Sequence, residues 1–442
     1  MYLWVLCVFL ASTAARKSFL GDKLISVVPA NLEQLKYLQE VQQTSEVDFW
    51  NHPIKVGAGV DVHVTADQLP EVDALFSAKH MTYKIKSNNI QRLIDGERDV
   101  SWQPSVMASA DVLTRYGSQQ EIVGWLEATA AKCGARCTLM PFGSSLEGRE
   151  MTVIKIVGNL EDRRSKPAAF VDGGIHAREW ISPAFVNNMI DKLINDYGSD
   201  STVTAMLDAH DWYIIPLLNP DGYQYSHDTD RMWRKNRAEP SRRQCYGVDL
   251  NRNFGYMFGG SGTSTNPCSE IYRGPNAFSE PESQNLRDFL LALDNLEVYL
   301  SFHSYGQYLL FPWGYDRDYA PNHDDLDDVG QAGAQTIREI TGEQWIVGNA
   351  AIELYPSAGA SDDWAYGGAG ATYAYCIELP PNDADGSGFI LPESRIPEVV
   401  NSVWPGVKAM MSRIIEKRQF VLPTHYVGKT GGLRKTLAQA GI

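Results

Sequence analysis

Ala168-Ala-Phe-Val-Asp-Gly-Gly-Ile-His-Ala-Arg-Glu179 is the stretch that decides the fold of this chain. Its apolar first half predicts a buried strand that ends in a Gly-Gly turn. Residues 180–194 then have the apolar spacing of a helix. His176 and Glu179 are three residues apart, so we expect their side chains to share one face at the helix start, where they could hold one metal ion. Alone, this spacing is common by chance.

Further strand-like runs and longer helical patterns alternate between about residues 110 and 415. The strand candidates are residues 152–157, 211–218, 300–305 and 372–379, and residues 336–340 belong to a helix expected to begin near Asp328. This alternation predicts an α/β domain with a mixed sheet flanked by helices.

Residues 16 to about 100 have a different pattern and predict a separate α+β module. Strand-like runs cover residues 23–28, 60–65 and 83–86, and helical spacing covers residues 32–41 and 69–81. Val60-Asp-Val-His-Val-Thr65 alternates as a half-buried strand does. The order of these elements suits an open sandwich with antiparallel strands.

Length, charge and the chain ends limit the class of protein. A chain of 442 residues with a net charge of -15 suits two domains and disfavours nucleic acid and anionic membranes as partners. Residues 1–15 are apolar and end in small residues, which predicts a signal peptide and secretion. They are too few to span a membrane. Residues 421–442 are polar, and we expect a loosely ordered or clipped tail.

Four other motifs carry residues suited to a hydrolytic site. Leu300-Ser-Phe-His303-Ser-Tyr305 ends a strand in a candidate third metal ligand, and Tyr373-to-Leu379 embeds Glu378 in an apolar run. Arginines stand near aromatic residues in Met232-Trp-Arg234 and in Asp249-Leu-Asn-Arg-Asn-Phe254. A carboxylate such as Glu378 is costly to bury without a partner or a function.

In their order and spacing, these motifs resemble the secreted, zymogen-type zinc carboxypeptidases of the pancreatic A/B family. The resemblance runs from about residue 110 to about residue 415, with a typical pro-segment before it. It implies a mixed eight-stranded sheet in a catalytic domain over residues 99–420 and an inhibitory pro-domain over residues 16–98. It also implies activation by a trypsin-like protease. Arg92 and Arg98 are both candidate cleavage sites, and Arg98 is favoured.

The resemblance implies a role for each catalytic candidate. One zinc ion would be held by three side chains, with the fourth position left for water: His176, Glu179 and His303. Asp249 would orient His176, Glu378 would act as general base, and Arg234 would stabilise the oxyanion. The alternatives are a turn aspartate, an ion pair inside the sheet and a surface arginine.

The same resemblance implies recognition of a free C-terminus. Asn251 and Arg252 would bind the terminal carboxylate, Tyr355 would close over the substrate, and Arg178 would guide the carboxylate. Tyr305 would contact the residue upstream of the scissile bond, although packing is nearly as frequent a role for such a tyrosine. For the Asn251-Arg252 pair the alternative is a surface turn.

Asp362 occupies the position of the specificity-pocket floor in the family. An aspartate there is typical of B-type enzymes, which release lysine or arginine. Asp363 would be structural, and Ala350 and Gly314 would line the pocket without deciding between the two basic residues. The alternative is an Asp362 side chain in solvent beside an apolar pocket. The segment from residue 364 to Glu378 is one residue longer than is usual in the family, which leaves its geometry open.

Five of the six cysteines lie beyond the signal peptide. Cys245 and Cys268 match the family's disulfide, Cys133 and Cys137 are placed to close a small loop, and Cys376 is left as a free thiol in a core strand.

The sequence therefore predicts a secreted, monomeric zymogen whose mature form removes C-terminal lysine or arginine from peptides. Two alternatives stay open: an A-type enzyme that releases apolar residues, and a silent binding protein that kept the fold.

Overall fold

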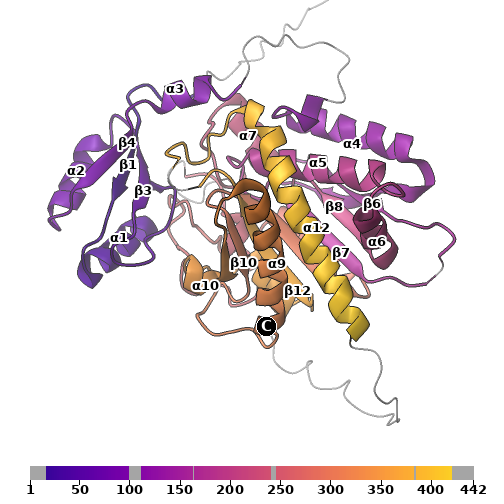
Figure 1. Cartoon of the computed structure of the whole chain (residues 1–442). Helices are drawn as coiled ribbons and strands as arrows, with labels where there is room; N and C mark the ends of the chain where they lie inside the picture. Colours follow the sequence, from indigo (N-terminus) through magenta and orange to yellow (C-terminus); the bar gives the residue numbers. More distant parts are fainter. Residues whose placement is uncertain (1–15, 99–110, 163, 240–244, 383–384, 421–442) are drawn as a thin grey trace, which may run out of the picture.

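The structure of the chain is a computed structural model that describes residues 16–98, 111–162, 164–239, 245–382 and 385–420. These residues form two β-sheets (Figure 1). The four-stranded sheet has one apolar core, and the eight-stranded sheet has an apolar core on each face. The expected signal peptide and the expected C-terminal tail lie outside the described residues.

The N-terminal domain is an antiparallel sheet covered by two helices, as the sequence predicted. Its strands are β1 (Lys23–Val27), β2 (Asp48–Phe49), β3 (Val60–Val64) and β4 (Tyr83–Ser87), in the spatial order β2-β3-β1-β4. Its helices are α1 (Leu32–Thr44) and α2 (Leu69–Ser77), followed by the connecting helix α3 (Ile90–Asp95). Ile25, Leu38, Val62 and Phe76 are members of the core between them.

One expectation for this domain was wrong. The alternation in β3 predicted a half-buried strand, but all five of its residues are buried, Asp61 and His63 included. The second face of the strand is covered because His63 and its neighbours lie beside the interface with the larger domain, where polar partners replace water.

The second domain is built on an eight-stranded mixed sheet within the described residues. In spatial order the strands are β11 (Ile346–Asn349), β10 (Tyr308–Phe311), β12 (Tyr373–Leu379), β9 (Leu296–Ser304), β7 (Ala168–Gly173), β8 (Asp211–Ile215), β6 (Glu150–Ile156) and β5 (Cys137–Ser144). The four central strands β12, β9, β7 and β8 are mutually parallel, and the pairs β10–β12, β8–β6 and β6–β5 are antiparallel.

Helices cover both faces of this sheet (Figure 1). They are α4 (Gln119–Cys133), α5 (Ile181–Asn195), α6 (Ser201–Ala209), α7 (Pro220–Asp228), α8 (Pro281–Leu291), α9 (His323–Thr341), α10 (Ala350–Glu353), α11 (Ser361–Gly367) and α12 (Ile396–Phe420). Short 3-10 turns are η1 (Asp111–Leu113), η2 (Gly134–Arg136), η3 (Leu250–Arg252) and η4 (Glu393–Arg395). Helix α9 begins five residues before the position expected from the sequence.

Strand β7 explains why the domain has two cores. Its alternate side chains Ala169 and Val171 pack into the core that contains α4, α5, α6, α9 and α12. Ala168 and Phe170 point to the other face and pack against α8 and α11. A parallel strand buried on both faces has the apolar run seen here from Ala168 to Val171, and the buried Asp172 follows it.

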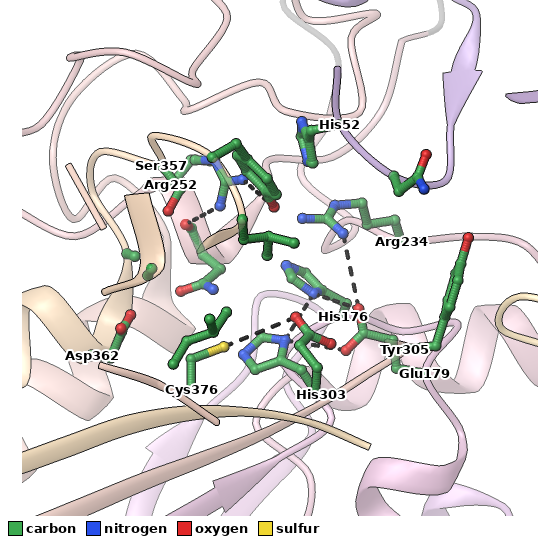
Figure 2. Close-up of a pocket in the computed structure, with 18 of the residues that line it drawn as sticks. His52, His176, Glu179, Arg234, Arg252, His303, Tyr305, Ser357, Asp362 and Cys376 are labelled. Atoms are coloured by element: carbon green, nitrogen blue, oxygen red, sulfur yellow. Dashed lines mark hydrogen bonds and ion pairs between the residues drawn. The ribbon is translucent and has the colours of Figure 1, made fainter. Parts of the chain in front are cut away.

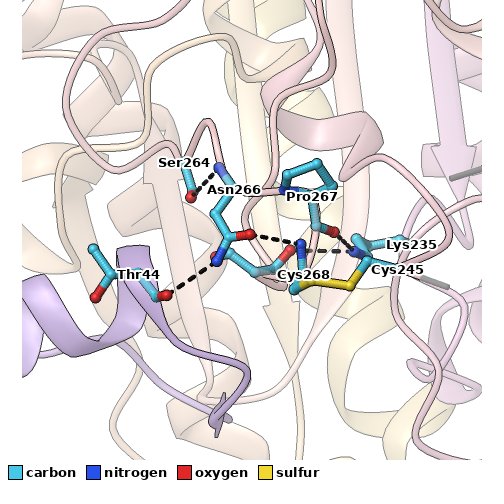
Figure 3. Close-up of a disulfide and its surroundings, with 8 residues drawn as sticks. Thr44, Lys235, Cys245, Ser264, Asn266, Pro267 and Cys268 are labelled. Atoms are coloured by element: carbon cyan, nitrogen blue, oxygen red, sulfur yellow. Dashed lines mark hydrogen bonds between the residues drawn. A yellow bond between two sulfur atoms is a disulfide. The ribbon is translucent and has the colours of Figure 1, made fainter. Parts of the chain in front are cut away.

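The described residues contain the disulfides Cys133–Cys137 and Cys245–Cys268. Figure 3 shows the second one beside the N-terminal domain, where the Asn266 side-chain amide donates a 3.0 Å hydrogen bond to the Thr44 carbonyl at the end of α1. Cys376 is a buried free thiol, as expected.

None of the helices in the described part of the chain combines the length and the apolar character needed to cross a membrane.

Candidate active site

The candidate site lies where three parallel strands end. In strands β12 and β9, Glu378 stands opposite His303 in the pairing register, and β9 in turn pairs with β7, which leads into His176. Parallel strands present their carboxyl ends at one edge of the sheet, so residues far apart in sequence meet there.

His176, Glu179 and His303 converge at this edge, and all three are buried (Figure 2). His176 Nδ1 lies 2.7 Å from Glu179 Oε1, and His303 Nδ1 lies 3.2 Å from Glu179 Oε2. The two Nδ1 atoms are 3.2 Å apart. The sequence placed His176 and Glu179 on a helix face, which is wrong: both lie in a turn before α5, which begins at Ile181.

Asp249 and Arg234 support this cluster from outside. Asp249 Oδ1 lies 3.2 Å from His176 Nε2, and its Oδ2 accepts a 3.0 Å hydrogen bond from Arg234 Nη2. Burial raises the pKa of Asp249, but the guanidinium groups of Arg234 and Arg252 outweigh burial and hold it well below its ordinary value. Asp249 is therefore a carboxylate that can only accept hydrogen bonds.

The donor set fits a zinc ion. Because Asp249 can only accept, the ring proton of His176 is on Nε2 and its Nδ1 carries a lone pair. That lone pair faces His303 Nδ1 and Glu179 Oε1, and one ligand atom from each of the three residues lies within 4.8 Å of the others. Two imidazole nitrogens and a carboxylate are ligands that zinc prefers, and without a cation such buried electron-rich atoms would repel each other.

Asn251, Arg252 and Tyr355 lie together on one side of the cluster. Arg252 Nη2 lies 3.2 Å from the Tyr355 hydroxyl, and its Nη1 donates to the Asn251 carbonyl. The Asn251 side-chain oxygen accepts a 2.8 Å hydrogen bond from the Ser361 amide. The sequence placed these three residues at one site, and the fold brings them to one cavity.

The cavity extends from the metal cluster to Asp362, which is 3 % exposed. Its walls near Asp362 are apolar or small side chains and one thiol: Leu310, Ala350, Leu354, Ser357, Ala360 and Cys376. Burial raises the pKa of Asp362. The alternative of an Asp362 side chain in solvent is therefore wrong.

Asp363 and Gly314 lie beside this cavity. Asp363 accepts hydrogen bonds from the backbone amides of Gly314 and Tyr315, at 2.7 and 2.8 Å. The Gly314 amide is turned toward Asp363, and its place as a wall of the pocket stays a prediction. A Cβ at Gly314 would meet Ser357 Oγ at 3.0 Å, so glycine keeps this corner open.

The N-terminal domain covers the mouth of the cavity. Asn51 and His52 line it, and the His52 ring stacks on Tyr355 with 3.6 Å between ring centroids (Figure 2). Asp48 Oδ1 accepts a 2.8 Å hydrogen bond from Arg178 Nη1. Tyr305 packs edge-on against Phe389 and lines the same cavity.

Sequence analysis missed the residues of the N-terminal domain that reach this site. The signal was present as Asp48-Phe-Trp-Asn-His52, a polar and aromatic run just after β2 begins, but nothing in its pattern says which surface it contacts. Cys376 was assigned to the core alone, yet it also lines the cavity. Arg98, the favoured cleavage site, stacks on Trp180 and lies 2.7 Å from His227 Nδ1, whereas Arg92 is exposed.

Comparisons with known proteins agree with this architecture. Residues 122–406 match the zinc carboxypeptidase family, and residues 25–97 match the carboxypeptidase activation peptide.

Relatives of both specificity types are similar to this chain. Mouse carboxypeptidase A2 is 34 % identical over 403 residues, which is 90 % of this chain and 95 % of the relative. Human carboxypeptidase B is 33 % identical over 403 residues, which is 90 % of this chain and 94 % of the relative. The solved structure of thrombin activatable fibrinolysis inhibitor has a TM-score of 0.80 and 32 % identity, covering 90 % of this chain and 100 % of that one. Carboxypeptidase A from Helicoverpa armigera has a TM-score of 0.83 at 28 % identity, covering 91 % and 99 %.

Proposed function

We propose, from the premise that this chain belongs to the zinc carboxypeptidase family and is a metallocarboxypeptidase zymogen, that its mature form releases lysine or arginine from the C-termini of peptides. The observation that carries this proposal is the buried carboxyl group of Asp362 at the end of the cavity. The A-type and B-type relatives have similar sequence identities to this chain, so the choice between the two specificities rests on the pocket.

A basic side chain in this pocket would meet Asp362 away from bulk water. At 4 Å and an effective dielectric of 20, the attraction is about 4 kcal/mol before desolvation costs. Burial raises the pKa of Asp362, so an ammonium or guanidinium group would favour the ionised form that the pocket alone disfavours. An apolar side chain would leave the carboxyl group without that partner.

We assign His176, Glu179 and His303 as the ligands of one zinc ion, because their donor atoms converge in a buried cluster. When bound, zinc supplies a Lewis acid that polarises the scissile carbonyl and makes water more acidic. Asp249 holds the His176 ring by its Nε2 proton, which keeps Nδ1 directed into the cluster.

Glu378 is assigned as the general base, and Arg234 as the group that stabilises the oxyanion. Glu378 lies beside His303 in the sheet register and lines the cavity, within reach of a water that attacks the last peptide bond. It would accept that proton and pass it to the leaving amine. Arg234 is buried and lines the same cavity, so its charge acts in a dry environment.

Asn251, Arg252 and Tyr355 are assigned to the terminal carboxylate. A guanidinium group binds a carboxylate with paired hydrogen bonds, which positions the last peptide bond. Tyr355 now contacts Arg252 through its hydroxyl, so a substrate carboxylate would displace it. Arg178, at the covered mouth, is assigned to guide the substrate's carboxylate, and Tyr305 to contact the residue upstream of the scissile bond.

Residues 25–97 match the carboxypeptidase activation peptide, which supports the N-terminal domain as the inhibitor of the catalytic domain. We propose secretion of a monomeric zymogen and cleavage after Arg98 or Arg92 by a trypsin-like protease. Arg98 is held by Trp180 and His227, so cleavage there requires its side chain to leave that contact.

An A-type preference for apolar residues is the second candidate. This preference is favoured by the apolar part of the cavity wall, formed by Leu310, Leu354 and Ala360. These side chains would contact an apolar substrate side chain as well as they would the apolar stem of a lysine. The silent binding relative is not supported, because Glu378, Arg234 and the three candidate zinc ligands line one cavity.

The deciding experiment is turnover after limited trypsin treatment, with matched peptides ending in lysine, arginine, leucine and phenylalanine. Release of basic residues alone, abolished by a zinc chelator and restored by zinc, is the expected result. Release of leucine or phenylalanine instead would reject the assignment of Asp362 but keep the zinc chemistry. No release after complete activation would favour the silent relative.

A further inference from the structure

His303 has a support on the side of its ring that faces away from the cluster. Its Nε2 lies 3.2 Å from the hydroxyl of Ser301, and that hydroxyl donates a 2.8 Å hydrogen bond to Asp172 Oδ1. Asp172 and Ser301 stand opposite each other in the parallel pairing of β7 and β9. All three side chains are buried, with exposed fractions of 0 %, 0 % and 1 %.

The directions of these two hydrogen bonds follow from the donors available. Burial raises the pKa of Asp172 to about 6, so near pH 7.5 the carboxylate form prevails and it only accepts. The single hydroxyl proton of Ser301 is therefore given to Asp172. The Ser301 oxygen can then only accept from His303, which puts the ring proton on Nε2 and leaves the Nδ1 lone pair facing Glu179.

We propose that Asp172 and Ser301 are positioning residues that fix the tautomer and orientation of His303 for metal binding. The proposal rests on the assignment of His303 as a zinc ligand. It means that both histidines are backed by a carboxylate, His176 directly by Asp249 and His303 through a hydroxyl. Such outer contacts hold a ligand ring in place before the metal arrives.

The segment from Asp172 to His176 thus has two functions. It supplies one ligand from the turn after β7, and it supplies the support of the other ligand from the end of β7 itself. The parallel register that places Asp172 opposite Ser301 thus joins the segment that leads to His176 to the strand that carries His303.

Cys376 also borders His303, from β12. It does not replace the serine in this role, because sulfur is a weak acceptor and the Ser301 hydroxyl already faces His303 Nε2.

The experiment measures the zinc dissociation constant of the full-length zymogen at pH 7.5 by competition with a chelator, without any activity assay. Ser301→Ala and Asp172→Asn are each expected to weaken zinc binding by about 10- to 100-fold. The visible spectrum of the Co²⁺-substituted protein should change in both variants. In the control Ser283→Ala, which removes a buried hydroxyl bonded to Asn253 and Glu280, zinc affinity should stay the same.

A double variant tests whether the two residues act as one unit. Ser301→Ala with Asp172→Asn should bind zinc no more weakly than the weaker single variant, because either change already breaks the same chain. Independent, multiplying losses would overturn the proposal. If Asp172→Asn does not fold, Ser301→Ala alone decides.

The outcomes separate this proposal from the proposed function. If the unaltered chain binds zinc but Ser301→Ala binds it equally well and only melts at a lower temperature, the positioning role is wrong while the enzyme assignment stands. If the unaltered chain binds no zinc, both are wrong.

Discussion

Asp48 of the N-terminal domain and Arg178 of the catalytic domain form an ion pair at the covered mouth of the site. Arg178 Nη1 lies 2.8 Å from Asp48 Oδ1 and 3.0 Å from Oδ2, and Arg178 is 1 % exposed. We assign the Arg178 guanidinium to substrate binding. In the zymogen the Asp48 carboxylate binds this guanidinium instead and thereby links the two domains.

Loss of this ion pair should raise the activity of the uncleaved zymogen. In Asp48→Asn, Arg178 stays buried without a charged partner, which costs about 2 kcal/mol or more of domain association. The activity of the uncleaved zymogen on a small substrate with a C-terminal arginine should rise by about 30-fold or more, by the same conversion. In the control, Lys17→Ala removes the partly exposed ion pair with Asp230 and should change the activity of the uncleaved zymogen little. If the Asp48→Asn zymogen were as inactive as the unaltered zymogen, the ion pair would not be what holds the N-terminal domain over the site.

His63 should make this inhibition depend on pH. Burial lowers the pKa of His63, but the hydrogen bonds to Asp22 and Asp48 outweigh burial and raise it above its ordinary value. A raised histidine pKa gives stability that is complete below the unfolded value, about 6.5, and is lost as pH rises through the folded value. Because His63, Asp22 and Asp48 all belong to the N-terminal domain, the stability lost above neutral pH is that of the domain which covers the site.

This pH effect is measured as the ratio of zymogen activity to activated-enzyme activity between pH 6 and pH 9. The ratio should rise with pH in the unaltered protein and vary less in His63→Gln. The charged groups around His63 are Asp22, Asp48, Lys17 and Arg178. Parallel pH profiles for both proteins would exclude His63 as the cause.

The Glu378→Gln variant should still bind zinc but lose most of its catalytic activity. The amide retains the shape of the side chain but cannot accept the proton of the attacking water, so kcat should fall by roughly 100- to 10,000-fold. Zinc content, measured by elemental analysis, should stay equal to that of the unaltered protein. Near-normal turnover in this variant would reject Glu378 as the base.

Asp362→Asn should remove the preference for basic residues. Loss of the buried charge should lower kcat/KM for peptides ending in arginine by about 100-fold, which corresponds to about 3 kcal/mol. Peptides ending in leucine should be affected much less. Ser357→Ala, which alters an uncharged wall of the same cavity, is the matched control. Equal losses for both peptides would mean that Asp362 supports the pocket without selecting its occupant.

Loss of the Cys245–Cys268 disulfide should destabilise the zymogen. The bond closes a loop with a sequence separation of 23, for which the chain-entropy estimate is about 3 kcal/mol. The paired variant Cys245→Ser with Cys268→Ser should therefore melt at a lower temperature in calorimetry. Cys133→Ser with Cys137→Ser opens a separation of only 4 and should cost less. The reverse order would contradict the entropic explanation.

Several local features could be predicted from sequence because they depend on neighbours in the chain. The apolar run before Gly173 predicted β7, and the alternation of elements predicted a mixed sheet, since periodicity reflects which faces are buried. Where prediction failed, more distant contacts were responsible. The burial of Asp61 in β3 depends on a salt bridge to Lys86 and on the packing around this strand, which no local pattern records.

The site divides in the same way. The sequence alone determined which residue types were available for hydrolysis, because histidine, glutamate and arginine motifs carry their chemistry in their side chains. Only the tertiary structure decided that Glu378 stands beside His303, that Asp362 is buried at the end of the cavity, and that Asp48 reaches Arg178. These are contacts between segments far apart in the chain. They exist because parallel strands end at one edge of the sheet and because an apolar cluster that includes Trp50, Tyr305 and Phe389 joins the two domains.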